Sequence, residues 1–168
     1  YLPEISETSI REAAEKRVCG IVRRQCGKKG KEGHASKRFF SAISCKGELK
    51  LSSEVDKLCK LIYQLDESMG LASPALEAAA REAISRGEEV ILCPSPLCPE
   101  ELEGVLMPGA SLAILKGCWN VEGGRHIRLD ALVPAQRQKE IRSELRAGRR
   151  LEKECTAAAL EKLRQAKA

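Results

Sequence analysis

The pattern of apolar and polar positions is most regular around residues 74–86, where it predicts a helix. Ser73 is a favoured N-cap residue, and Pro74 suits the first helical position. Gly87 suits the position just past the C-terminal end, where the backbone often needs a positive φ. Start and stop signals therefore agree with the apolar spacing between them.

Three further helices are predicted from apolar residues three and four positions apart. The first ends near Gln25, and the second is short and begins at Ser52 or Ser53. The third is basic and runs from Ala135 to the end of the chain, with Gly148 as a potential break.

Short apolar runs between these helices predict strands near residues 61–65, 90–93, 110–117 and 125–132. The stretch 99–108 mixes acidic and apolar residues and predicts a helical turn with a connection. Strands that alternate with helices are typical of a layered α/β protein with a mainly parallel sheet.

The segment "CGKKGKEGHASKR", residues 26–38, is rich in glycine and basic residues and has no periodicity. We interpret it as a solvated linker, with an anion-binding arm as the alternative. The predicted division of the chain is a helical segment with this basic linker over 1–36, and one domain over 37–168 that ends in the basic helix.

Composition limits the classes of protein that the chain can belong to. Its 168 residues suit about one domain, and the low aromatic content of 3% means that the core depends on Leu, Ile, Val and Ala. The eight cysteines lack the dense spacing of a small secreted domain, so we expect reduced thiols and a cytoplasmic location. No apolar run of about 18 residues is present, so we expect no membrane span.

The stretch "LDESMGLAS", residues 65–73, has the outline of a phosphate-binding loop between a strand and a helix. A nucleotide-binding loop would read G-x-x-x-x-G-K-[ST]. Gly70 retains the second glycine, and Ser73 supplies a hydroxyl one position later than the motif requires. Gly70 and Ser73 are therefore the candidate cofactor-binding residues, as the remnant of a phosphate loop.

Three stretches together resemble the second half of a family of tandem P-loop ATPase-like proteins from spore-forming and related bacteria. "KRFFSAISCKG" is similar to the family's R-H-x-F-x-x-A-x-T-P-x-G segment. "IYQLDESMGLASPALEAAAREAISRGEEVILC" lies over its strand, Walker A loop, helix and next strand. "LCPEELEGVLMPGASLAILKG" resembles its S-D-P-D-S-L-D-G-V-x-x-P…V-A-I-L-D-G segment.

The resemblance implies a P-loop NTPase-like, three-layer α/β/α fold with flanking helices, and a site for ATP and Mg²⁺. Position by position, the chain departs from that site. Leu65 stands at the first loop glycine, Leu71 at the lysine and Ala72 at the Mg²⁺-binding hydroxyl. Asp66 and Glu67 add negative charge where phosphate would bind. We therefore expect no ordinary ATP binding or hydrolysis and name no catalytic residue; whether the chain is an enzyme stays open.

Three hypotheses for function remain. The first is a degenerate P-loop domain that acts as a structural or regulatory half beside a second P-loop domain of the same polypeptide. The chain begins with Tyr1 rather than Met, so we expect further residues upstream. The second is an ATPase-like or kinase-like enzyme that uses an altered loop with ATP and Mg²⁺. The third is a basic module for nucleic acid or an acidic partner.

Metal binding is not expected from the sequence. Cys93 and Cys98 are spaced too loosely for a zinc pair, and neither Cys118 nor His126 completes a site.

Overall fold

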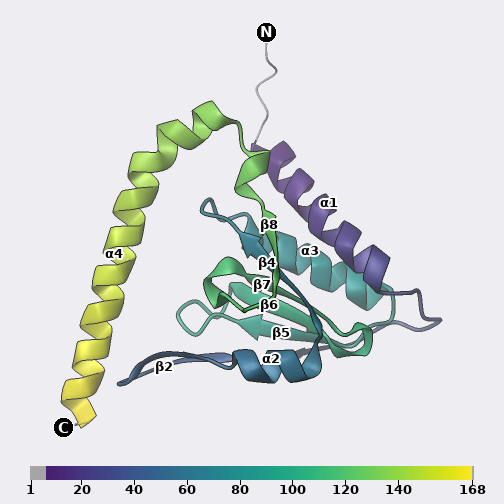
Figure 1. Ribbon diagram of the computed structural model, residues 1–168, viewed down its shortest axis with the longest axis horizontal. Coiled ribbons are helices and arrows are strands. Elements are labelled where there is room, and N and C mark those ends of the chain that lie inside the picture. Colours follow the sequence, from purple (N-terminus) through teal and green to yellow (C-terminus); the bar gives the residue numbers. More distant parts are fainter. Residues whose placement is uncertain (1–6, 168) are drawn as a thin grey trace.

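The computed structural model describes residues 7–167 and places six strands in one sheet (Figure 1). In spatial order the strands are β1 (Ala35–Lys37), β5 (Val90–Pro94), β6 (Leu102–Met107), β7 (Leu112–Lys116), β4 (Leu61–Asp66) and β8 (Arg125–Arg128). Neighbouring strands are parallel except at β6, which is antiparallel to both β5 and β7. The prediction of an α/β fold with a mainly parallel sheet is confirmed.

The central strand β6 corrects the prediction of a helical turn over 99–108. All six of its residues are buried, including Glu103, whose carboxylate accepts a hydrogen bond of 2.7 Å from Ser41 Oγ. Gly104 lies so close to β7 that a Cβ there would be 2.5 Å from Leu115 Cδ2. Glu103 and Gly104 make this strand hard to predict from the sequence, because Glu and Gly are both depleted in strands generally.

A second small sheet was also missed from the sequence. Strands β2 (Ser41–Ser44) and β3 (Gly47–Lys50) form an antiparallel hairpin. Gly47 has a φ of 116° in its turn, which favours glycine over other residues.

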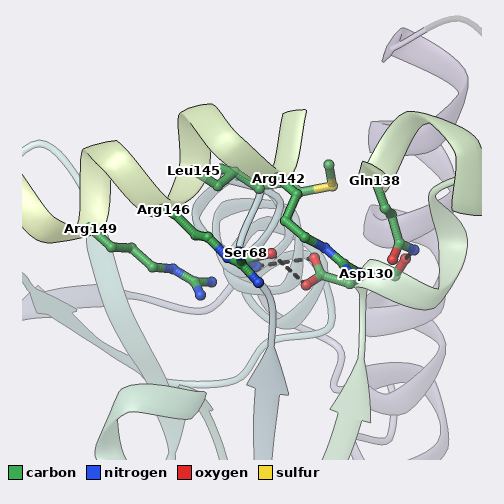
Figure 2. Close-up of a pocket in the computed structure, with 8 residues that line it drawn as sticks. Ser68, Asp130, Gln138, Arg142, Leu145, Arg146 and Arg149 are labelled. Carbon is green, nitrogen blue, oxygen red and sulfur yellow. Dashed lines mark hydrogen bonds between the residues drawn. The ribbon is translucent and has the colours of Figure 1, made fainter. Parts of the chain in front are cut away.

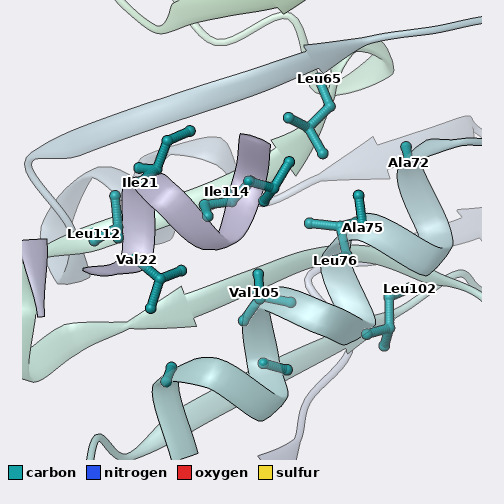
Figure 3. Packing of buried hydrophobic residues seen from close by; sticks show 14 of the residues in the cluster. Ile21, Val22, Leu65, Ala72, Ala75, Leu76, Leu102, Val105, Leu112 and Ile114 are labelled. Atoms are coloured by element: carbon teal, nitrogen blue, oxygen red, sulfur yellow. The ribbon is translucent and has the colours of Figure 1, made fainter. Parts of the chain in front are cut away.

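Helices cover both faces of the main sheet. On one face, α1 (Glu7–Gln25) and α3 (Ala72–Ser85) pack together, and their apolar residues join those of the strands in one cluster (Figure 3). On the other face, α2 (Ser52–Leu58) contributes Val55 to a cluster with Trp119 and Val121. This arrangement is consistent with three layers. Helix α3 begins two residues earlier than predicted, whereas Gly87 follows it with a φ of 87°, as expected for a residue past the helix end.

The glycine-rich segment between α1 and β1 contains no helix or strand over residues 26–34, yet it is attached to the body of the protein. The backbone N–H of Lys29 donates to Arg86 O (2.8 Å), and that of Gly33 donates to Ile84 O (2.9 Å). A Cβ on Gly33 would lie 1.9 Å from Glu88 O. The segment therefore follows a fixed path along the C-terminal end of α3.

Helix α4 (Ala135–Lys167) runs beside the rest of the molecule without a break at Gly148 (Figure 1). None of its described residues is buried. Gln138 Nε2 donates to the carbonyls of Asp130 and Val133 near its start, and Arg164 Nε donates to Cys45 O near its end. These contacts connect both ends of the helix to the body.

Among residues 7–167, no helix is both long and apolar enough to cross a membrane. All eight cysteines are free thiols.

Candidate functional site

The candidate loop between β4 and α3 is shorter than the resemblance to a Walker A loop suggests. Strand β4 continues through Leu65, which pairs with Lys116 of β7, and through Asp66, which pairs with Arg128 of β8. Leu65 is 1% exposed and belongs to the apolar core. The position expected for the first loop glycine is thus a buried strand position, which leaves only residues 67–71 for the turn.

Glu67 organises this turn. Its Oε2 accepts hydrogen bonds from three backbone N–H groups, those of Met69 (2.8 Å), Gly70 (2.6 Å) and Leu71 (3.1 Å). Gly70 has a φ of 74°, which aims these successive amides at one point. Successive N–H groups that converge in this way form an anion-binding concavity. In this chain the anion bound there is the carboxylate of Glu67.

The remaining loop positions face the core or other partners. Leu71, at the lysine position of the motif, packs partly buried against the core, and Ala72 is fully buried. Ser73 Oγ accepts a hydrogen bond from the Leu102 N–H of β6 (3.3 Å) and makes no cap bond. Neither a cation nor a free hydroxyl therefore stands at the positions where the motif needs them.

Gly70 and Ser73, the two predicted site residues, do line one surface cavity of about 430 Å³. Its other lining residues are Arg11, Glu15, Pro74, Glu77, Arg81, Glu100 and Glu101. Four carboxylates against two guanidinium groups make this cavity unfavourable for a polyphosphate.

A second cluster lies at the carboxyl ends of β4 and β8. Asp66 on β4 contacts His126 Nδ1 on β8 through both carboxylate oxygens, at 3.0 and 2.9 Å. Ser68 does not join this pair, because its Oγ donates to Asp130 Oδ2 at 2.7 Å. The hydroxyl, the imidazole and the Asp66 carboxylate thus do not form a nucleophile, base and orienting acid in series.

Lys116 lies close to the loop's acids, because β7 lies beside β4 and Lys116 pairs with Leu65. Together with Asp66 and Glu67 it lines a cavity of about 280 Å³. Its Nζ forms an ion pair with Glu101 Oε2 at 3.3 Å. Lys116 therefore already pairs with the carboxylate of Glu101, a residue outside the loop.

Sequence reasoning missed the role of Glu67, which it treated only as a repulsive charge. The signal was available, because an acid just before a helix start is well placed to accept the helix's free N–H groups. The contribution of Asp130 had no local signal, since it lies 62 residues from Ser68.

No metal site is apparent among residues 7–167, where no group of three or more His, Cys, Asp or Glu is placed to hold an ion. Cys93 is buried in β5, and burial raises the pKa of its thiol to about 12. The neutral thiol is the form that packs there.

The chain was also compared with protein-family models, curated proteins and solved structures. None of these comparisons gave a match.

Proposed function

We propose that this chain is a degenerate, catalytically silent domain of the P-loop NTPase type. In this proposal it is a structural or regulatory half of a tandem ATPase-like protein of the cytoplasm. The observation that supports it best is the Glu67 carboxylate, which accepts three successive backbone N–H groups of the turn, those of Met69, Gly70 and Leu71. In a working phosphate loop, such N–H groups point at the ligand.

The negative charge of Glu67 lowers the affinity of the turn for a phosphate group. Two unit charges about 5 Å apart at an effective dielectric of about 20 interact by roughly 3 kcal/mol. A phosphate that approached the turn would meet this repulsion without a loop lysine to offset it. The helix dipole of α3 offers only about 0.3–1 kcal/mol in return. The balance corresponds to a loss of affinity on the order of a hundredfold.

Titration of the chain with ATP and Mg²⁺ in a calorimeter tests this proposal. We expect no saturable binding at the loop up to about 1 mM nucleotide. Binding at micromolar concentration that is lost in both Gly70→Ala and Ser73→Ala would instead favour an enzyme that uses an altered loop.

The proposed partner is a second P-loop domain of the same polypeptide. If this part of the proposal holds, the residues encoded upstream of Tyr1 contain an intact G-x-x-x-x-G-K-[ST] motif. An upstream region that encodes no such motif would contradict this part of the proposal.

A second candidate function rests on α4. This helix carries ten Lys and Arg residues against five Glu, and none of its described residues is buried. An exposed basic helix suits contact with a nucleic-acid backbone. A mobility shift with duplex DNA or RNA that weakens steeply with salt would favour this function.

A further inference from the structure

Three arginines of α4 face the β4–α3 loop. Arg142, Arg146 and Arg149 are four and three positions apart, so they lie on one side of the helix. Figure 2 shows their side chains extending from α4 toward Ser68 and Asp130. Together with Met69, Gln138 and Leu145, these residues line a cavity of about 280 Å³.

The wall opposite the arginines is held by hydrogen bonds. Asp130, in the 3₁₀ turn η3 (Asp130–Leu132), accepts from the Ser68 N–H at 3.0 Å and from Ser68 Oγ at 2.7 Å. Gln138 Nε2 donates to Asp130 O at 2.7 Å and so ties the start of α4 to the same turn. These hydrogen bonds fix the wall opposite the arginines, because they join the β4–α3 loop, η3 and α4 to one another.

The charge in this cavity is poorly compensated. Within residues 7–167, none of the three arginines forms an ion pair or a hydrogen bond, whereas other arginines of α4 do. Arg150 pairs with Glu154 at 2.9 Å, and Arg137 pairs with Glu7. The lining contains three guanidinium groups and one carboxylate, and that carboxylate already accepts two hydrogen bonds.

The acids just outside the cavity also have partners. Asp66, Glu67 and Arg128 line an adjoining cavity of about 370 Å³. It shares Ser68, Asp130, Gln138 and Arg149 with the first. Asp66 contacts His126, and Glu67 is held by the loop amides. Arg128 adds a further cation at this edge. The guanidinium groups therefore remain available to a ligand from outside the chain.

We propose that this cavity binds a small phosphorylated ligand, whose phosphate or diphosphate group is held by Arg142, Arg146 and Arg149. Guanidinium groups match phosphate oxygens in planar, bidentate pairs. The volume of about 280 Å³ is slightly below the range of about 300–1,000 Å³ for small-molecule sites, so it suits a diphosphate or a small phosphate ester better than a whole nucleoside triphosphate. The cations come from α4 rather than from the loop, so this site does not depend on the proposed loss of P-loop function.

Calorimetric titration of the full chain with inorganic pyrophosphate tests the proposal. We expect saturable binding below about 1 mM, and a loss of affinity of about tenfold or more in Arg146→Gln and Arg149→Gln. The matched control is Arg150→Gln, which removes the same charge from the adjacent position and should change affinity by less than about twofold. All these side chains are exposed, and circular dichroism verifies that each variant keeps its helix content.

Absence of pyrophosphate binding at about 1 mM would overturn the proposal. Equal weakening by Arg149→Gln and Arg150→Gln would also overturn it, because it would reveal a diffuse charge effect along α4. Tighter binding of duplex DNA than of pyrophosphate, with equal losses of DNA affinity in Arg149→Gln and Arg150→Gln, would also overturn the proposal. ATP binding that is lost in Arg146→Gln but kept in Gly70→Ala would support this cavity and leave the proposed silence of the loop intact.

Discussion

At the scale of single residues, Glu67 combines a structural task with an electrostatic one. Its carboxylate satisfies backbone donors that a helix start would otherwise leave free. The same carboxylate places a negative charge where the loop could accept a phosphate. A substitution at this position should therefore change stability and anion affinity together.

Glu67→Ala should lower the free energy of unfolding by about 1–3 kcal/mol, because it leaves three backbone N–H groups without their acceptor. Urea denaturation measures the change. The control is Glu122→Ala, since Glu122 is exposed and has no hydrogen bond or ion pair within residues 7–167; its effect should stay within about 0.5 kcal/mol. Equal effects of the two variants would mean that the Glu67 hydrogen bonds add nothing to stability.

At the scale of elements, the segment 26–34 shows how a stretch without periodicity can still be fixed in place. Composition predicts a linker over residues 26–38, and no helix or strand forms over 26–34, whereas Ala35–Lys37 form strand β1, which the sequence did not predict. The contacts of segment 26–34 are with backbone and side-chain groups at the end of α3 and just past it, including the ion pair between Lys29 and Glu88 at 2.9 Å. These partners are distant in sequence, so no local signal encodes them. The path depends on Gly33, because the backbone of Glu88, three residues past the end of α3, approaches too closely for any side chain at position 33.

Gly33→Ala should destabilise the fold by about 2 kcal/mol or more, because the new Cβ would overlap the Glu88 backbone. Gly30→Ala is the matched control, since a Cβ at Gly30 meets nothing within 4 Å. That control should be neutral or should stabilise by about 0.4–1 kcal/mol, through the smaller entropy of the unfolded chain. Thermal and urea unfolding of both variants decides the matter; similar midpoints would show that the segment is not held as described.

The elements also show how far the sequence could predict the fold. Helices 7–25, 52–58, 72–85 and 135–167 and strands β4, β5, β7 and β8 follow from residue spacing and from end signals such as Gly87. Strand β6 and the β2–β3 hairpin do not, because Glu103 and Gly104 disguise the first and polar residues make up much of the second. In the site, Gly70 was found, but the three amides on Glu67 and the Ser68–Asp130 contact depend on tertiary geometry.

At the scale of the whole molecule, buried thiols link stability to pH. Burial raises the pKa of Cys93 to about 12, and those of Cys26 and Cys59 to about 11, from an ordinary value of 9.0. The folded state therefore keeps these protons more tightly than the unfolded state does. The resulting stabilisation is complete below about pH 9 and is lost as the pH rises toward 11 and 12.

We expect the free energy of unfolding to fall between about pH 9 and pH 10.5, measured with urea under reducing conditions. Cys93→Ala should reduce this slope relative to the parent chain, even though the variant starts from a lower stability. Because lysines and tyrosines also titrate in this range, the difference between the two slopes is the informative quantity. Identical slopes would mean that the thiol does not contribute.

The order of strands in the main sheet has a further consequence, for the sequence of events in folding. Strands β5, β6 and β7 are consecutive along the chain and adjacent in space, so residues 90–116 can form a β-meander through contacts between residues that are close in sequence. The other pairings join residues that are farther apart in sequence, such as Leu61 with Leu112, Tyr63 with Arg125 and Ala35 with Val90. Since contacts between distant parts of a chain form more slowly than local ones, the antiparallel centre is the natural nucleus on which the parallel flanks assemble.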